Sequence, residues 1–271
     1  MTINMSNIRY FYGNPNNDGD GYMQVMQTFS FHESLNSART SSLPLAQFWR
    51  PNDLGERINQ IRGLKEEEVK RALSEPAKRC FEYPTLLPDG CEGKGKPSMT
   101  DLMLLSDRYR IAIEAKYTEY LGSGSAYRPL IKDWKKENLK NRTKVLSGWL
   151  CHIGDRIEHN DDILDNIPYQ LIHRIASACA DIGENTAPIV IYHLFFDTSF
   201  HDDAQFFANQ LLNWANELRL KEVGFHILLT EVRVSSDAIN REDDGSLNTI
   251  FLDIGKKDFY GSLCSTRLLS R

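Results

Sequence analysis

The alternation of apolar and polar residues predicts strands and helices in a mixed order. Residues 110–117 predict a β-strand, whose successive side chains point to opposite faces, and residues 100–105, apolar apart from Thr100 and Asp101, predict a second strand before it. The residues between them, Ser106-Asp107-Arg108-Tyr109, have turn chemistry, so the two strands are expected to form a hairpin. Residues 188–196 are almost wholly apolar, which is typical of a strand buried on both faces.

Helical periodicity and further β-forming runs continue the pattern along the chain. Pro168 and Gly183 bracket a helix expected at 168–182, and Asn52 is expected to cap a helix that ends at Gly63. Elsewhere we expect helices at 64–77 and from Asp202 or Asp203 to about 221, strands at 80–87, 225–234 and 249–254, and a surface loop at 235–248.

A length of 271 residues is compatible with a single α/β domain. Around its core we expect an N-terminal helical or irregular extension at about 1–63 and a basic helical insertion at about 118–165. The strand, helix and strand from 188 to 234 have the spacing of a βαβ unit.

The hairpin carries charges that its apolar pattern does not explain. Glu114 and Lys116 share one face of the second strand, while the face of Ile111 and Ile113 is apolar. If the turn centres on Asp107-Arg108, Asp101 faces Glu114 across the hairpin, where like charges repel. Two carboxylates beside a lysine suit a hard cation such as Mg²⁺. A three-residue turn would instead put the two carboxylates on opposite faces.

These residues resemble the PD-(D/E)xK nuclease superfamily. Asp101 matches the aspartate of the motif and Glu114-Ala115-Lys116 matches its E-x-K, whereas Thr100 stands where the motif has proline. A literal Pro88-Asp89 occurs earlier, but Gly90 after it marks a turn rather than the start of a strand.

The resemblance implies a restriction endonuclease-like three-layer fold, with a central mixed β-sheet flanked by helices. It also implies that Asp101 and Glu114 hold Mg²⁺ (or Mn²⁺) and that Lys116 completes the catalytic group, with its pKa lowered by partial burial. Further catalytic candidates implied by the superfamily are an acidic residue of the helix before the strands, for which Glu68 competes with its neighbours and with Glu82, and Gln170 of the helix after them.

Basic residues gather just after the hairpin, although the net charge of the chain is −5. Residues 128–144 hold seven cationic residues against Asp133 and Glu137. Cationic side chains neutralise phosphates, and Trp134 among them could stack on a base. The alternative is a helix whose lysine face is merely solvated. The expected nucleic-acid-binding residues are Lys132, Lys135, Lys136, Lys140, Arg142 and Lys144.

Other chemistries lack their motifs. The chain has no phosphate-binding glycine loop for ATP or NAD, no G-x-S-x-G, and no Cys/His spacing for zinc. Five widely spaced cysteines indicate reduced thiols in a cytoplasmic protein, and no apolar stretch is long enough for a membrane span or a signal peptide.

The preferred hypothesis is therefore a metal-dependent nuclease that hydrolyses phosphodiester bonds, in DNA by the usual range of the superfamily, with a restriction, defence or repair role. A homodimer is compatible with an enzyme that cuts both strands. One alternative is a non-catalytic nucleic-acid-binding or assembly module on the same fold. Another is a protein whose Asp101 and Glu114 lie on opposite faces and whose partner is of a different kind.

Overall fold

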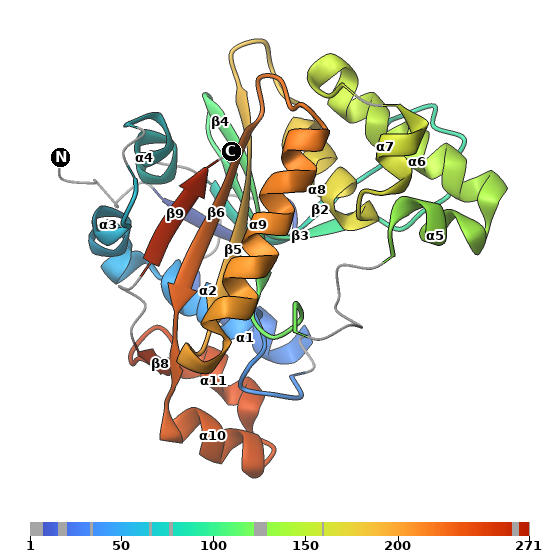
Figure 1. Cartoon of the computed structure of the whole chain (residues 1–271). Helices are drawn as coiled ribbons and strands as arrows, with labels where there is room; N and C mark the ends of the chain where they lie inside the picture. Colours follow the sequence, from blue (N-terminus) through green and yellow to red (C-terminus); the bar gives the residue numbers. More distant parts are fainter. Residues whose placement is uncertain are drawn as a thin grey trace.

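The chain folds around one central mixed β-sheet, in a computed structural model that describes residues 8–15, 21–32, 35–64, 67–75, 78–121, 129–158, 160–261 and 266–270. Among these residues the sheet has seven strands in the order β1-β2-β3-β4-β5-β6-β9 (Figure 1). They are β1 (Arg9–Tyr12), β2 (Lys78–Thr85), β3 (Ser98–Leu105), β4 (Tyr109–Lys116), β5 (Ala187–Phe196), β6 (Gly224–Glu231) and β9 (Thr266–Ser270), while β7 (Arg233–Val234) pairs separately with β8 (Tyr260–Gly261).

Strand direction divides the sheet into two parts. β2, β3 and β4 form an antiparallel meander, and β5 and β6 then follow in parallel to β4. The edges are β1, parallel to β2, and β9, antiparallel to β6. The connection from β5 to β6 runs through a helix, which confirms the βαβ unit expected from the sequence.

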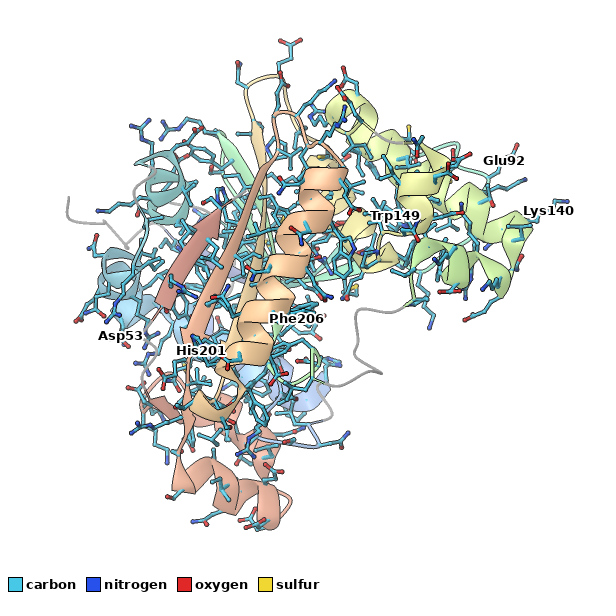
Figure 2. The ribbon with its side chains drawn as sticks, viewed as in Figure 1. Asp53, Glu92, Lys140, Trp149, His201 and Phe206 are labelled. Atoms are coloured by element: carbon cyan, nitrogen blue, oxygen red, sulfur yellow. The ribbon has the colours of Figure 1, made fainter. Side chains whose placement is uncertain are left out.

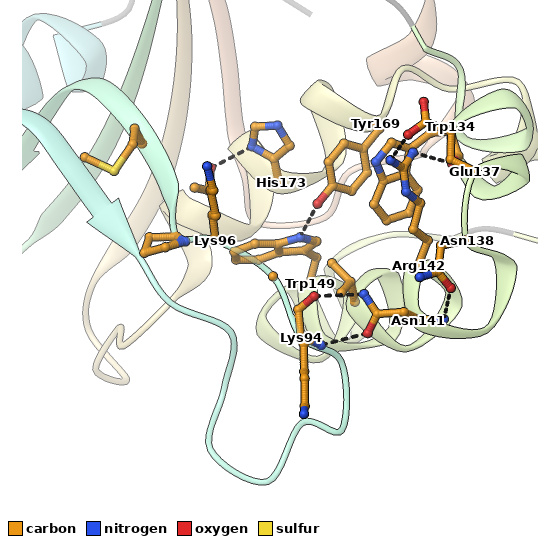
Figure 3. Close-up of a pocket in the computed structure, with 15 residues that line it drawn as sticks. Lys94, Lys96, Trp134, Glu137, Asn138, Asn141, Arg142, Trp149, Tyr169 and His173 are labelled. Atoms are coloured by element: carbon orange, nitrogen blue, oxygen red, sulfur yellow. Dashed lines mark hydrogen bonds and ion pairs between the residues drawn. The ribbon is translucent and has the colours of Figure 1, made fainter.

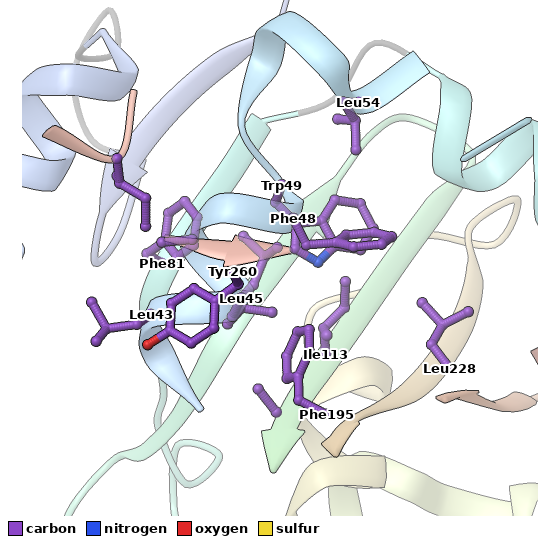
Figure 4. Close-up of a cluster of buried hydrophobic side chains, with 14 of the residues drawn as sticks. Leu43, Leu45, Phe48, Trp49, Leu54, Phe81, Ile113, Phe195, Leu228 and Tyr260 are labelled. Atoms are coloured by element: carbon purple, nitrogen blue, oxygen red, sulfur yellow. The ribbon is translucent and has the colours of Figure 1, made fainter. Parts of the chain in front are cut away.

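Helices cover both faces of the sheet, so that the molecule has three layers (Figure 1). One apolar core lies between the sheet and α1, α2, α3, α4, α10 and α11; Figure 4 shows Phe48 and Trp49 of this core over Ile113 and Phe195 of the sheet. The other core lies beneath α5 to α9. The helices are α1 (Tyr22–His32), α2 (Ser42–Phe48), α3 (Pro51–Gln60), α4 (Glu67–Ser74), α5 (Ile131–Lys136), α6 (Leu139–Ile153), α7 (Asp161–Asp165), α8 (Tyr169–Cys179), α9 (His201–Glu217), α10 (Ser236–Asp243) and α11 (Ile250–Asp253).

The hairpin register expected from the sequence is confirmed. Leu104 pairs with Ile111 and Leu102 pairs with Ile113, as a turn centred on Asp107-Arg108 requires. Ile111 and Ile113 point into the core under α1 to α4, whereas Ala112 belongs to the core under α8. By alternation, Glu114 and Lys116 share the face of Ala112, which α8 covers.

Two expectations for the C-terminal part are wrong. Residues 236–243 form α10 instead of a surface loop, with Ser235 as its N-cap. Residues 250–253 form α11 instead of a strand, because the adjacent Ile250 and Phe251 are both buried, and one face of a strand could not bury both.

The N-terminal residues are part of the core rather than an appendage. β1 extends the sheet, and α1, α2 and α3 bury apolar side chains against it. Arg50 precedes α3 and Pro51 occupies its first turn, so Asn52 lies inside the helix instead of capping it. None of the described helices is long and apolar enough to cross a membrane.

The buried side chain of Gln47 in α2 forms hydrogen bonds with residues 259–260, which lie more than 200 residues further along the chain. Its side chain has no exposed surface. Its Nε2 donates to the carbonyl of Tyr260 at 2.8 Å, and its Oε1 accepts the N–H groups of Phe259 at 2.7 Å and Tyr260 at 3.0 Å. Buried polar groups need such partners, so this amide holds α2 against the segment that contains β8.

Replacement of Gln47 by leucine should therefore destabilise the protein by roughly 3 kcal/mol, because it leaves three buried backbone groups without partners. Chemical denaturation monitored by circular dichroism measures this difference. Gln60→Leu is the matched control, since Gln60 is exposed and bonds only to Glu56. Equal stability of the two variants would contradict the role assigned to Gln47.

Candidate active site

β3 and β4 cease to pair regularly at the position of Asp101. The ladder between them runs from Leu105 to Leu102, and beyond it the Asp101 carboxylate accepts the backbone N–H of Ala115 through Oδ2 at 2.6 Å. On the other side of β3, the pairing with β2 omits Glu82, whose φ is +49°. A left-handed conformation is costly for a residue other than glycine, and such distortions concentrate at functional sites.

Glu114 lies one strand away and is almost fully buried, with 1% of its surface exposed. Its Oε1 accepts hydrogen bonds from Lys116 Nζ at 2.7 Å and from Gln170 Nε2. Its Oε2 forms an ion pair with Arg174. Oε1 therefore accepts two hydrogen bonds, while Oε2 makes no hydrogen bond in the described part of the chain and is compensated by the guanidinium charge of Arg174.

Arg174 ties this carboxylate to the start of β3. Besides the ion pair, its guanidinium donates to the hydroxyl of Thr100 and to the carbonyl of Met99, the latter at 2.8 Å. Gln170 and Arg174 lie four residues apart on α8, so that they project from the same face of the helix. α8 thus supplies two donors to the Glu114 carboxylate.

Burial and neighbouring charges set the protonation of these groups. Burial, together with the Glu114 carboxylate, raises the pKa of Asp101 to about 7. Burial acts in the same direction on Glu114, but the charges of Arg174 and Lys116 outweigh it and lower the pKa of Glu114. Burial alone would lower the pKa of Lys116, yet Glu114 and Asp101 raise it to about 12, contrary to the lowering implied by the resemblance.

The carboxylate oxygens of Asp101 and Glu114 are the type of ligand that a hard divalent cation prefers. Asp101 is only half-buried, and in the described part of the chain no donor meets its Oδ1. Glu114 adds a second carboxylate, which would exchange a cationic partner for a metal. No group of three or more acidic, histidine or cysteine ligands occurs among the residues that the structure describes, so any other ligands would be backbone, water or substrate oxygens.

The structure does not bring Glu68 to this group. Glu68 is exposed on α4 and lies beside Ala187 and Gly224, where β5 and β6 begin. Glu114 pairs with Tyr192, five residues further along β5 than Ala187, which is roughly 17 Å at the rise of a strand. The helix before the strands therefore crosses the opposite end of the sheet.

Acidic and amide neighbours already engage most of the expected nucleic-acid-binding residues. Arg128 lies outside the described residues. Among the others, Lys140 alone has no charged or polar partner in the described ranges, and Figure 2 shows it at the outer end of the helical group. The pairs are Lys132 with Asn166, Lys135 with Asp165, Lys136 with Asp133, Arg142 with Glu137, and Lys144 with Glu92. Such exposed pairs are weak, so phosphates could still compete for these side chains.

Arg174 is the residue of the site that the sequence did not indicate. A charged helix residue is usually solvated, yet only 1% of the surface of Arg174 is exposed. The spacing of four residues from Gln170 was the available signal, because any helix face that presents Gln170 to the site presents Arg174 as well.

The raised pKa of Asp101 predicts a pH-dependent stability. The folded state holds this proton more tightly than the unfolded state, so the stabilising effect is complete below about pH 4 and is lost as the pH rises through about 7. Asp101→Asn removes the ionisation and still accepts the Ala115 N–H. It should be more stable than the parent by roughly 4 kcal/mol at pH 8, with no advantage at pH 4.

Urea denaturation at several pH values, with EDTA present, measures this difference. Asp107→Asn removes a carboxyl from the exposed turn of the same hairpin and should retain the pH profile of the parent. A stability difference between Asp101→Asn and the parent that does not change from pH 4 to pH 8 would contradict the assigned environment of Asp101.

Comparison with known proteins identifies a family without an assigned activity. No curated protein and no solved structure matches the chain. Residues 20–236 match the family described as a domain of unknown function (DUF6946), a span that includes both strands of the hairpin and α8. The chain therefore belongs to the DUF6946 family.

Proposed function

We propose that the protein is a metal-dependent nuclease that hydrolyses phosphodiester bonds in DNA. The observation that carries the proposal is the hairpin register, which puts Asp101 beside Glu114 and Lys116 on the face that α8 covers. Gln170, expected on the same grounds, donates to Glu114 from that helix. A pair of carboxylates, a lysine and a glutamine are the groups that the PD-(D/E)xK resemblance implies.

The order of elements supports a restriction endonuclease-like form of the three-layer fold. That form has a helix, three antiparallel strands, a second helix and a further strand. Here α4 precedes the meander of β2, β3 and β4, and α8 leads to β5, which lies parallel to β4. The inserted helices α5, α6 and α7 lie between β4 and α8 in the chain.

The side chains divide the chemistry among them. Asp101 and Glu114 would hold a divalent cation, which would supply Lewis acidity at the phosphate and at the attacking water. Lys116 remains protonated at neutral pH, so it stabilises developing negative charge instead of acting as a base. Gln170 and Arg174 fix the orientation of the Glu114 carboxylate. Asp101 must lose its proton to serve as a ligand, which favours pH values above about 7.

One observation favours the alternative of a non-catalytic nucleic-acid-binding module. Lys116, Gln170 and Arg174 already satisfy Glu114, so the fold does not need a metal to bury this carboxylate. The two carboxylates and two cations also balance when all four are charged, which leaves no excess negative charge to attract a metal. Metal binding and cleavage therefore have to be measured separately.

Cleavage is tested first by substitution within the site. With Mg²⁺, Lys116→Ala and Asp101→Asn should each lower the rate of cleavage of plasmid or single-stranded DNA by about 100-fold or more, because each removes charge at the phosphate or a metal ligand. Glu68→Gln is the matched control, since it neutralises a carboxylate at the far end of the sheet and should leave the rate unchanged. Persistence of Mg²⁺-dependent cleavage in both site variants would show that this site is wrong.

Metal affinity separates the two functions. Because the charges of the site balance, Mn²⁺ should bind weakly to the protein alone and more tightly when a cleavage-resistant phosphorothioate DNA contributes phosphate ligands. Calorimetric titration with and without that DNA measures the effect, which Asp101→Asn should abolish. DNA binding without any metal binding would favour the non-catalytic module.

A further inference from the structure

A cavity of about 750 Å³ opens between the start of β3 and helices α5, α6 and α8 (Figure 3). One wall is the loop 94–99 that leads into β3, and the opposite wall is the turn between α5 and α6 with the first half of α6. Tyr169 and His173 of α8 close it from a third side. A cavity of this size is in the range of sites for small organic ligands or parts of polymers.

Aromatic side chains line the cavity and hold one another in place. The rings of Trp134 and Tyr169 are stacked, with centroids 3.8 Å apart and planes inclined by 11°. Trp149 donates from Nε1 to the Tyr169 hydroxyl at 2.7 Å, and Figure 3 shows this bond at the centre of the cavity. His173 bonds to Ser98 at 2.7 Å. Trp134, Tyr169 and His173 are each half-buried, so they retain surface toward the cavity.

Two lysines on the wall of the cavity differ from most of the basic residues of α5 and α6, because no carboxylate pairs with them in the described part of the chain. Lys94 and Lys96 are exposed, and in the described part of the chain no carboxylate pairs with either. Arg142 lies over Trp134 at 4.9 Å from the ring centroid and neutralises Glu137, the carboxylate of the wall. The cavity therefore combines aromatic surface with two uncompensated positive charges.

The loop that carries the two lysines is fixed to α6. Asn141 accepts the backbone N–H of Lys94 at 2.9 Å and donates to its carbonyl at 2.8 Å. A side chain at Gly93 would approach the backbone nitrogen of Val145 to 2.6 Å, so the close contact between loop and helix requires glycine. The wall is thus formed before any ligand arrives.

The cavity adjoins the candidate active site on the same face of the sheet. Met99 lines it and lies two residues before Asp101 on β3, a separation of roughly 7 Å on one face of the strand. His173 lines it and lies three residues after Gln170 on α8. A ligand in the cavity would therefore lie next to a phosphate held at Asp101.

We propose that this cavity binds one unpaired nucleotide of the substrate strand, next to the phosphate that is cleaved. The base contacts the aromatic side chains around Trp134 and Tyr169, and its phosphate lies against Lys94 and Lys96. This inference rests on the proposed nuclease function and specifies its substrate. A base inside a duplex is stacked and paired, so the cavity selects single strands, frayed ends or extruded nucleotides.

The test measures binding in EDTA, where no cleavage occurs. Fluorescein-labelled single-stranded oligonucleotides of eight thymidines, intact or with one abasic position moved along the strand, are titrated with protein and followed by anisotropy. At one position, loss of the base should weaken binding to the parent protein by about tenfold, the usual effect of a lost base–aromatic contact. In Trp134→Ala the same abasic change should have little effect, because the partner of the base is absent.

Two further variants guard against misfolding and general weakening. Gly93→Ala leaves every aromatic side chain in place but displaces the loop from α6, and should also reduce the effect of the abasic position. Phe206→Ala removes an aromatic that is 65% exposed on α9, outside the cavity, and should respond to the abasic position as the parent does (Figure 2).

The outcomes distinguish this inference from the proposed function. If no abasic position weakens binding to the parent, or if the effect is the same in Trp134→Ala, the cavity does not bind a base, and cleavage that depends on Lys116 would leave the nuclease proposal intact. Binding of free thymidine monophosphate without binding of the oligonucleotide would likewise overturn the inference in favour of a small-molecule site. If the parent protein neither binds the oligonucleotides nor cleaves DNA, both proposals are refuted.

Discussion

A buried carboxylate in the centre of the sheet governs the arrangement around it. β4 is buried along its whole length, and Glu114 there would cost several kcal/mol if it lacked counter-charges. Lys116 supplies one charge from the same strand, but Arg174 and Gln170 come from α8. The position of α8 on the sheet is therefore fixed by electrostatics as well as by apolar contacts, and Arg174 extends this constraint to β3 through Thr100 and Met99.

The two parts of the candidate site differ in how much freedom they retain. The Glu114 carboxylate is engaged by two positive charges, those of Lys116 and Arg174, and the second of them is balanced only when Asp101 is ionised. Asp101 lies at the edge of this group of charges. It is half-buried, and its pKa is the higher of the two carboxylates. In the cavity next to it, the aromatic side chains hold one another through ring stacking and a hydrogen bond, whereas the side chains of Lys94 and Lys96 are exposed. The proposed chemistry and the proposed recognition would thus meet at Asp101, where the strand pairing of β3 is irregular.

The sequence predicts best those features that depend on residues close together in the chain, and it predicts less well those that depend on how distant elements pack. Turn chemistry and the apolar pattern both act within twenty residues, and together they predict the hairpin register of residues 102–105 with 110–113, which brings Asp101 close to the strand segment of Glu114 and Ala115. Gln170 was predicted from the resemblance, which implies a glutamine on the helix after the strands. Arg174 resembles a solvated helix residue, because only its spacing of four residues from Gln170 links it to Glu114. Glu68 failed for a related reason, since only the path of α4 across the sheet decides which end it reaches.

The amide of Gln47 has a consequence for how the protein is synthesised. The layer of helices that contains α1, α2 and α3 is completed by α10 and α11 and by the segment at β8, which Gln47 binds. Until residues 236–261 have been synthesised, these early helices lack the part of their cover that α10, α11 and the β8 segment provide, although the sheet strands up to β6 and α8 are already made. The nascent chain then exposes apolar surface to aggregation, because residues 236–261 complete a core that residues 22–60 begin.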